Sequence, residues 1–567
     1  MKKISILYFI FAFCSITAMR RPLPRQEWRP SEEEEQSPSI KQLAIAPKVQ
    51  KTLPESQQKE LPKQLSEEVQ QQIKWLRGLA EKGQFSNEVA TDILRNFATI
   101  EMPGKSNEEK LDNAIMAIRN FMNAFPQFYR DELTNTNLIE KLTKKYTPGT
   151  SMDFAIPIAI KLKTNGSGIW LQKKIGNNPN LIRYVCGRFL NAIKNNQNSS
   201  AFFILNYFPL CINAIDREGS SALTIAAKER EANLVKRLLT IQGINVNVQD
   251  SQGYTALIHA AAAGRLEAVV ELLRVPGLNV NVTEIRGVTA LMFAAQNGYI
   301  TIVEQLLGAT GIDVHVASGR RGVTAFMLAA ENGKTTILDL LLPKVNVNAQ
   351  SKEGGTALMY AAEKGQSAVI RKLFTVPGVN PNLRNQNGRT ALMIAAQKGY
   401  LAVVEELLRF SGIKVDEQDQ MGNTALMLAS QDGKANVVER LLRVPGIDVN
   451  YKNKFFANET PLILAARNGH TAVVEALLRK PEINVNDKRD GGATALMFAA
   501  RNAHFAVVER LLKEPRINVN ERTADGFTAL KIARTEDADA ARFRMAGIPK
   551  PNRQEIIKLL VAHGATE

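Results

Sequence analysis

The stretch that decides the fold spans residues 253–273 and reads GYTALIHAAAAGRLEAVVELL. Thr255 is a good N-terminal cap for a helix, because its hydroxyl can accept a free backbone N–H of the first turn. Leucine and alanine then recur at helical spacing as far as Gly264, which ends a short first helix. A second, more apolar helix follows, and Pro276-Gly277 stops it. The stretch therefore predicts a unit of helix, turn, helix and then a protruding turn or hairpin.

This unit recurs ten times, at spacings of 32 to 36 residues, and each copy begins with a Thr or Ser at the cap position. A period in this range predicts a stacked array, in which each unit buries its apolar face only against its neighbours. We therefore expect an all-α solenoid over residues 220–567, with a long surface that favours binding over catalysis. The ten cap positions are Ser221, Thr255, Thr289, Thr324, Thr356, Thr390, Thr424, Thr460, Thr494 and Thr528.

The repeated pattern D-x-x-G-x-T-x-L-x-x-A-A-x-x-G-x-x-x-V-V-x-x-L-L resembles the ankyrin repeat family, and the resemblance covers about three fifths of the chain. One departure is that the family's Thr-Pro-Leu-His is here usually Thr-Ala-Leu-Met, and only Thr460-Pro461-Leu462 keeps the proline. We expect the methionines to replace the family's histidine network by packing. We also expect Leu408, in the second helix of its repeat, to be buried between stacked repeats.

Both ends of the array depart from the period, as terminal repeats do when they cap a stack. Residues 151–219 are interpreted as degenerate ankyrin-like repeats, of which 184–216 fits the period best. In the last repeat, extra residues near 536–549 separate the two helices, and we expect a surface loop or a short extra helix there.

The N-terminal third divides into three regions. Residues 1–18 combine two lysines, a short apolar run and a small-residue end at Ala18, which predicts a secretory signal peptide. Cleavage, retention as an anchor and lipidation at Cys14 remain open. Residues 19–65 contain seven prolines and a run of four glutamates, which predicts a disordered linker. Residues 66–150 show helical periodicity without a recognisable family.

The composition limits the partners. The net charge of +16 could attract nucleic acid, an acidic partner or an anionic surface. However, the charges are spread along the repeats without a basic block or a nucleic-acid-binding motif, which favours a solvated basic surface over nucleic-acid binding. Outside the signal region only Cys186 and Cys211 remain. We expect two buried thiols there, with one disulfide as the alternative.

No residue pattern indicates catalysis, a metal or a cofactor. The sequence Gly333-Lys334-Thr335 resembles the end of a phosphate-binding loop, but Leu328 occupies the place of the first glycine. No nucleophile has a matched base, although the 66–150 region could contain an unrecognised enzyme. The five histidines stand in different repeats without metal-ligand spacing; they are His259, His315, His470, His504 and His563.

The resemblance implies two kinds of partner-binding position. The first is the pair of residues that follows Ala-Ala in the first helix: Gln296, Asn297, Glu331, Asn332, Glu363, Lys364, Gln397, Lys398, Arg467 and Asn468. The second is the hairpin tip: Arg320, Arg321, Arg384, Lys454, Phe455, Phe456, Lys488 and Arg489. Phe455 and Phe456 do not recur with the period, so we expect them to be exposed on a tip enlarged by two residues.

These features predict an exported, monomeric, non-enzymatic scaffold that binds another protein, for which the resemblance suggests a host or cell-envelope protein. One alternative is a basic array that binds nucleic acid or an anionic surface. A second alternative is an enzyme whose array recruits its substrate.

Overall fold

The structure is a computed structural model, and it describes residues 165–229, 232–455, 457–535 and 553–567 with nine scattered positions between 110 and 160. The regions expected at 1–18 and 19–65, nearly all of 66–150, and the extra residues expected near 536–549 lie outside the described residues. The chain divides into two compact units, residues 1–216 and 217–567. In the described part every regular element is a helix, and the hairpins contain only isolated β-bridges. The all-α prediction is confirmed.

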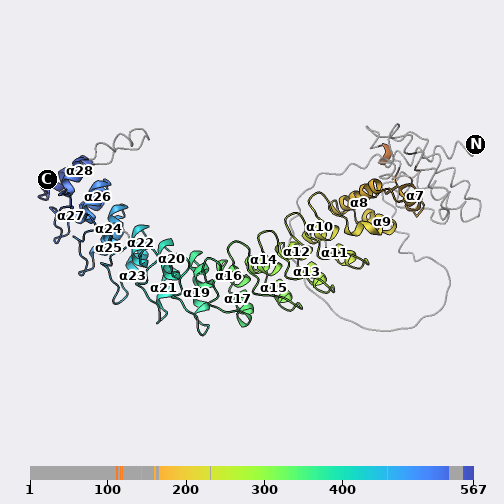
Figure 1. Cartoon of the computed structure of the whole chain (residues 1–567), viewed down its shortest axis with the longest axis horizontal. Helices are drawn as coiled ribbons and strands as arrows, with labels where there is room; N and C mark the ends of the chain where they lie inside the picture. The colour runs from red at the N-terminus through yellow and green to blue at the C-terminus, as the bar shows by residue number, and fades with distance from the viewer. Residues whose placement is uncertain are drawn as a thin grey trace, which may run out of the picture. The chain divides into compact units, whose positions relative to one another are not determined.

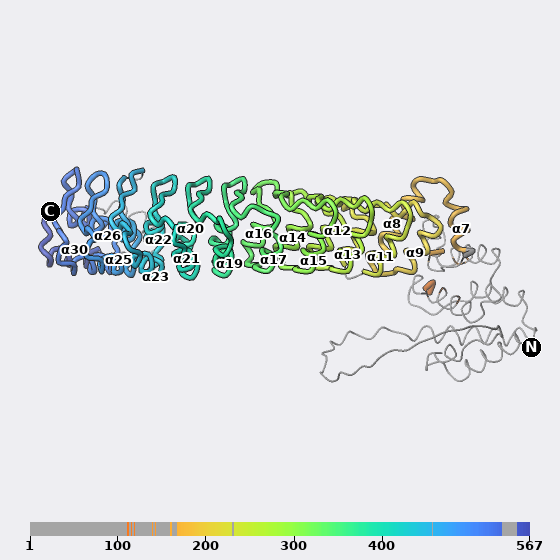
Figure 2. Tube along the Cα trace, turned by 90° about the horizontal axis from the view of Figure 1, so that it is seen from below, coloured from red at the N-terminus to blue at the C-terminus, as the bar shows by residue number. Residues whose placement is uncertain are grey.

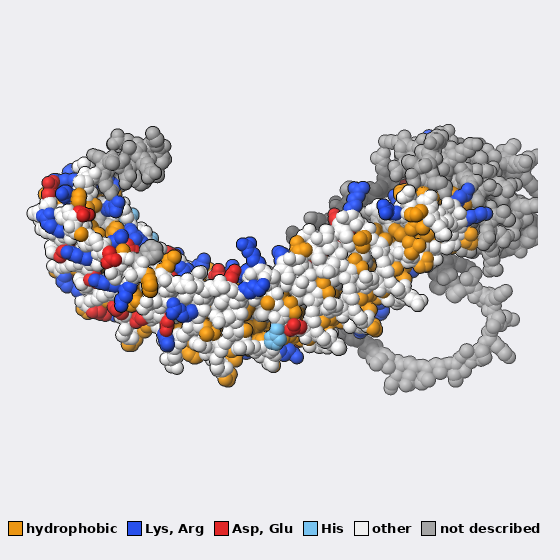
Figure 3. Space-filling view, viewed as in Figure 1, with side chains coloured by type: hydrophobic (Ala, Val, Ile, Leu, Met, Phe, Trp, Pro, Cys, Tyr) orange, Lys and Arg blue, Asp and Glu red, His pale blue; other side chains and the backbone are white. Residues whose placement is uncertain are grey.

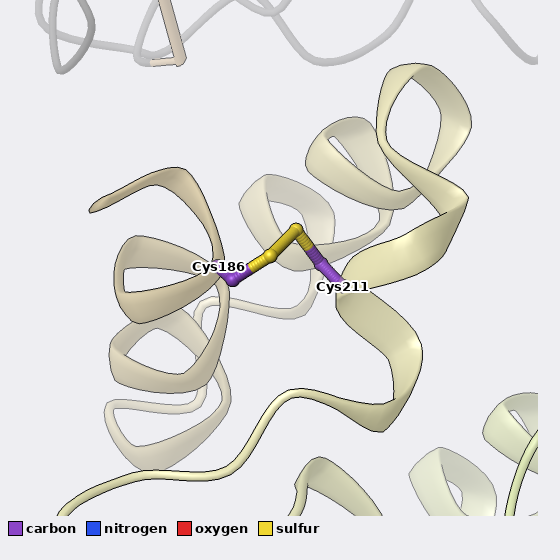
Figure 4. The surroundings of a disulfide bond; sticks show 2 residues. All are labelled: Cys186 and Cys211. Carbon is purple, nitrogen blue, oxygen red and sulfur yellow. A yellow bond between two sulfur atoms is a disulfide. The ribbon is translucent and has the colours of Figure 1, made fainter. Parts of the chain in front are cut away.

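The first unit contains a helical segment joined by a disulfide. Its described helices are α7 (Asn165–Ile175), α8 (Pro179–Lys194), α9 (Asn198–Tyr207) and the 3₁₀ helix η3 (Pro209–Asn213). Cys186 of α8 is bonded to Cys211 of η3, with their Cα atoms 4.9 Å apart (Figure 4). The expectation of two free thiols is therefore wrong. The intervening helices bring the two buried side chains into bonding geometry, which sequence spacing alone does not reveal.

The second unit is a stack of ten helix pairs. Figure 1 shows the first and second helices of the pairs as two rows. In Figure 2 the backbone of each repeat has nearly the same shape as that of the next repeat. The first helices are α10 (Ala222–Lys228), α12 (Ala256–Ala262), α14 (Ala290–Asn297), α16 (Ala325–Glu331), α18 (Ala357–Glu363), α20 (Ala391–Lys398), α22 (Ala425–Gln431), α24 (Pro461–Arg467), α26 (Ala495–Arg501) and α28 (Ala529–Thr535).

Each first helix is followed by a second helix. These are α11 (Ala232–Leu239), α13 (Leu266–Leu273), α15 (Ile300–Leu307), α17 (Thr335–Leu341) continued by η4 (Leu342–Lys344), α19 (Ser367–Leu373), α21 (Leu401–Leu408), α23 (Ala435–Leu441), α25 (Thr471–Leu478), α27 (Phe505–Leu512) and α30 (Arg553–Ala562). The expectation that the second helix is the more apolar one fails in several repeats, as in α18 and α19.

The cap prediction holds in every repeat. The hydroxyl at each of the ten cap positions accepts the backbone N–H three residues further along, at 3.2–3.4 Å. A short helix has few internal hydrogen bonds, so this cap satisfies a large share of its free N–H groups. It also fixes where each first helix begins, and therefore which side chains face the core.

Small residues let the first helices approach closely. The two alanines of each Ala-Ala pair, such as Ala294 and Ala295 of α14, are fully buried, and each first helix packs against the next one along the chain. Leucines and valines of the second helices complete this core.

Of the two leucines that end α21, Leu407 is buried and Leu408 is only half-buried. The expectation that Leu408 is buried is therefore wrong. Helical periodicity places both leucines near the apolar face, and the buried face of α21 is the one shared by Val403, Val404 and Leu407.

Asparagine side chains join the linkers of successive repeats. The Asn247 amide donates to the Gly277 carbonyl at 2.9 Å, and its oxygen accepts the N–H of Asn279 at 2.9 Å. Both halves of the amide are therefore used, and they hold the two linkers in one register. The same pair of bonds recurs at Asn281, Asn348, Asn382, Asn450, Asn486 and Asn520. These seven residues are called the asparagine ladder below.

Asp416 occupies a ladder position and lacks the donor that the ladder needs. An ionised carboxylate can only accept hydrogen bonds, so it can take the N–H of Asp448 but cannot donate to a carbonyl. Burial raises the pKa of Asp416, the N–H of Asp448 opposes this, and the negative charge of Asp448 adds to it. The ladder is therefore weakened at this step whenever Asp416 is charged.

We expect Leu407→Ala to lower the free energy of unfolding by about 2–5 kcal/mol, because it leaves a cavity between stacked repeats. Leu408→Ala is the matched control and should cost less, because its side chain is already partly in water. Hydrogen exchange should show lost protection mainly in the repeats that flank α21. Equal loss in every repeat would contradict neighbour-only stabilisation.

We expect Asp416→Asn to stabilise the protein at neutral pH by about 1 kcal/mol, because the amide restores the missing donor. The raised pKa means that the folded state binds the proton more tightly than the unfolded state. The wild-type contribution of Asp416 is therefore fully favourable below its unfolded pKa and is lost as the pH rises through its folded pKa. Urea unfolding across that pH range should show the gain from Asp416→Asn shrinking on acidification.

Asn382→Asp, at an intact ladder position, is the matched control for this prediction. It should destabilise the protein at neutral pH and recover part of the loss on acidification, since it removes the same donor. If the free energy of unfolding of Asp416→Asn and of Asn382→Asp varies with pH as that of the wild type does, then the charge of a carboxyl at a ladder position does not weaken the asparagine ladder.

Candidate functional site

The positions expected to bind a partner fall into two groups in the structure. The groove positions lie at the ends of the first helices, and the tip positions lie in the hairpins that precede them. Several of these side chains make contacts within the chain. A side chain already held by its own repeat is less available to a partner than one that projects into water.

Two of the groove-pair asparagines, Asn297 and Asn468, join neighbouring repeats, and Asn332 bonds within its own repeat. The Asn297 amide donates to the Ala262 carbonyl at 3.2 Å, and the Asn332 amide to the Leu328 carbonyl at 2.9 Å. The Asn468 amide reaches the carbonyls of both Gln431 and Leu464. These bonds satisfy carbonyls at the C-terminal ends of first helices. The three asparagines therefore have structural roles that their place in the repeat did not reveal.

Most charged residues at the expected positions form ion pairs. Glu331 lies 3.6 Å from Arg321 and 3.8 Å from Lys364. The buried Glu459 carboxylate accepts Arg467 at 2.5 Å and lies 3.4 Å from Arg489. Further pairs join Lys488 to Glu521 and Arg384 to Glu417, and Gln397 accepts a hydrogen bond from Arg389. Figure 3 accordingly shows charges of both signs mixed over the C-terminal repeats on the visible face.

Six of the expected residues have no such contact within the described part of the chain. Five are polar, namely Gln296, Arg320, Glu363, Lys398 and Lys454, and the sixth is Phe455. Phe455 is 71% exposed, as expected for its place on the tip. Phe456 lies outside the described residues. Phe455 thus differs from the others in presenting a large apolar side chain to water.

A second exposed apolar residue, which was not expected from the sequence, lies on the tip before that of Phe455. Met421 stands at the tip of the preceding repeat and is 52% exposed. The corresponding tips carry Gln252 and Asn387, so a comparison of tip positions across repeats could have singled out Met421. Ile285, 68% exposed on a tip further back, is the third such residue. Met421 and Phe455 are the pair that occurs on successive tips.

A hollow opens beside these tips. It measures about 710 Å³ and lies between residues 414–420 and Phe455, with Arg384 at its edge. Asp416 lines the hollow. The pKa of Tyr451 is raised by burial and also by the negative charges of Asp448 and Asp416. The hollow is open to solvent and has both apolar and charged lining. It offers a place for a side chain of a partner, without the converging acid and base of a catalytic site.

The side chains of His259, His470 and His504 have structural contacts. His259 Nε2 lies 2.8 Å from the Asp250 carboxylate, and burial lowers the pKa of His259 although Asp250 opposes this. His470 and His504 donate from Nε2 to the carbonyls of Gln431 and Arg467. Among the described residues, no three His, Cys, Asp or Glu side chains gather in a way that could hold a metal ion. In the same part of the chain, no helix is long and apolar enough to cross a membrane.

Comparison with known proteins gives one family match. The family model for ankyrin repeats in three copies matches six overlapping segments, residues 189–284, 223–318, 291–384, 363–453, 445–523 and 462–566. Together these segments cover more than half of the chain. A search of curated proteins finds no match.

We expect Phe455→Ser and Met421→Ser each to change the free energy of unfolding by no more than about 0.5 kcal/mol, because both side chains are mostly in water. Asn453→Ala in the same hairpin is the contrasting variant. Its side chain is buried, accepts the N–H of Phe455 at 3.0 Å and donates to Asn423 at 2.6 Å. It should cost about 1–3 kcal/mol. Thermal unfolding of the three variants would decide, and a large loss in Phe455→Ser would show that the ring is part of the packing.

Proposed function

Because the chain belongs to the ankyrin repeat family, we propose that it is an exported, non-enzymatic scaffold that binds another protein through its hairpin tips and first-helix ends. An array of ankyrin repeats is a protein–protein interaction scaffold. The observation that carries the finer proposal is the exposure of Met421 and Phe455 on successive tips. Large apolar side chains in water stabilise a complex when a partner covers them, and methionine and aromatic residues are enriched in interfaces.

The charge pattern favours a protein partner over nucleic acid. A nucleic-acid surface needs cations that are free to face phosphates. Here the groove and tip cations are largely paired with carboxylates, as Lys488 is with Glu521 at 2.6 Å and Arg321 with Glu331. Mixed charges of this kind select a partner of complementary pattern and set its orientation.

The export proposal has support from two separate parts of the chain. The N-terminal residues 1–18 have the charge and apolar pattern of a secretory signal. The Cys186–Cys211 disulfide would persist in an oxidising compartment and would be reduced in most cytosols. We propose a host or cell-envelope protein as the partner on the basis of the resemblance to exported ankyrin proteins.

We expect mass spectrometry of the protein purified from its source to find an N-terminus directly after Ala18 and a mass lacking two hydrogens for the disulfide. Treatment with a reductant before alkylation should then add two alkyl groups. A chain that begins at Met1 and is alkylated without reduction would contradict export.

Partner binding can be tested with the full chain immobilised on a resin. Candidate host and cell-envelope extracts are passed over it, retained proteins are identified, and each is purified and titrated against the chain by calorimetry. A one-to-one complex that survives physiological salt supports the proposal. The nucleic-acid alternative predicts instead a DNA affinity that falls steeply as salt increases. The scaffold proposal fails if no purified protein binds.

A further inference from the structure

Backbone hydrogen bonds join the hairpin tips of successive repeats. The N–H of Ile285 donates to the Gln252 carbonyl at 3.0 Å, and the N–H of Gln420 donates to the Asn387 carbonyl at 2.9 Å. Equivalent bonds leave Ser251, Gly319, Lys352, Gln386, Asp490 and Ala524. These bonds are called the tip ladder. They bring neighbouring tips so close that a Cβ on Gly253 would lie 3.0 Å from the backbone of Glu284.

The tip ladder is interrupted once, between the tip that carries Met421 and the tip that carries Lys454 and Phe455. This place is called the step. Within the described residues, the N–H of Lys454 has no hydrogen-bond partner, although its place corresponds to that of Gln420 one repeat earlier. This tip belongs to the repeat with two extra residues, where Ala457 and Asn458 both take left-handed backbone conformations. The ladder resumes beyond it, where the N–H of Asp490 donates to the Ala457 carbonyl at 2.7 Å.

Side chains fill the place of the missing backbone contact. A Cβ on Gly422 would meet the Asn453 amide and the Phe455 ring, whereas at Gly253 it would meet only backbone. The Asn453 amide donates across the step to Asn423 at 2.6 Å and so keeps the two repeats in register. Side-chain contacts thereby stand where the tip ladder elsewhere has a backbone hydrogen bond. The step opens onto the hollow described above, with Phe455 on one side of it.

The charges around the step face water unequally. Lys414 is 67% exposed, while its partner Glu417 is 24% exposed and the Asp419 carboxylate is almost fully covered. Lys452 likewise pairs with a more buried Asp487, and Lys454 is exposed without an ion pair in the described part of the chain. Glu417, Asp419 and Asp487 are therefore more covered than the lysines beside them, although Asp416 and Glu417 still line the hollow. Beside the exposed ring of Phe455, the cation without an ion pair in the described part of the chain is Lys454.

We propose that the step formed by Met421, Lys454 and Phe455 is a docking site for an extended acidic segment of the partner protein. The proposal rests on the proposed function, because it specifies the segment that the scaffold binds. An apolar side chain of the segment lies against Met421 and Phe455, and a carboxylate of the segment faces Lys454. A carbonyl of the segment accepts the free N–H of Lys454, in the way that the tip ladder uses this N–H elsewhere.

A peptide fits these features better than a lipid surface does. Exposed Phe beside Lys would also suit an anionic membrane. However, the Lys454 N–H, which has no partner among the described residues, is a directional donor that an extended backbone satisfies, and the hollow is concave. Both features favour a chain with a defined register over a flat anionic surface.

The proposal can be tested with a fluorescent peptide about nine residues long, in which glutamates flank a central Leu-Phe pair. Two matched peptides replace the glutamates by lysine or the Leu-Phe pair by serine. We expect the acidic apolar peptide to bind the full chain and the other two to bind at least tenfold more weakly, roughly the effect of losing one anchor. Phe455→Ser, Met421→Ser and Lys454→Glu should each weaken binding by a similar factor.

Ile285→Ser is the control variant, because Ile285 is equally exposed on a tip whose ladder bond is intact. It should bind the acidic peptide as the wild type does. The proposal is overturned if Ile285→Ser weakens binding as much as Phe455→Ser, or if the lysine peptide binds equally well. It is also overturned if the peptides do not bind while phosphatidylserine vesicles bind the wild type and not Phe455→Ser, since the site then serves a membrane.

The same variants separate this inference from the proposed function. If a purified partner protein binds Phe455→Ser, Met421→Ser and the wild type equally, the docking site is wrong and the scaffold function stands. If no protein binds the wild-type chain, the scaffold function itself is wrong.

Discussion

Each repeat depends on its neighbours because it cannot bury its apolar face alone. A pair of seven- or eight-residue helices is too short to be stable in water by itself. In α14 the fully buried Ala294 and Ala295 have their partners on the adjoining first helices. Packing of the two helices within one repeat is therefore not enough, and burial is completed by the neighbouring repeats. The other regular features of the second unit follow from this requirement, since they bring successive units close and hold them in register.

The asparagine ladder and the tip ladder both perform this task, at two places in the connection between one helix pair and the next. Apolar packing is not directional and would allow adjacent repeats to slide, whereas a side-chain amide that both donates and accepts fixes one register. Glycine at the tips lets the backbones approach to hydrogen-bonding distance. At Gly253, with a φ of 82°, a side chain would be strained and would also collide with the next tip. Stability and register are thus supplied by different groups.

The sequence was informative where a contact repeats and silent where it does not. The caps, the Ala-Ala pairs and the helix boundaries follow from local chemistry, so they could be predicted for every repeat. The burial of Leu407 in place of Leu408 depends on which face of α21 the neighbouring helices cover, and the Cys186–Cys211 bond depends on how α8 meets η3. The roles of Asn297, Asn332 and Asn468 depend on which carbonyl lies within reach. These are three-dimensional facts that residue order does not contain.

The same reasoning indicates where specificity must reside in a periodic molecule. A residue that recurs in every repeat serves the stacking, because stacking is the one requirement that every repeat shares. Recognition of a single partner requires the opposite, a position where the repeats differ. The step between Met421 and Phe455 meets this condition, because the tip ladder is interrupted there, two residues are added and apolar side chains face water. Asp416 interrupts the asparagine ladder in the same repeat. Two departures from the periodic hydrogen bonding thus adjoin one hollow. Hydrogen bonds between repeats are missing there, and a partner can bond to the polar groups and cover the apolar side chains that are left exposed.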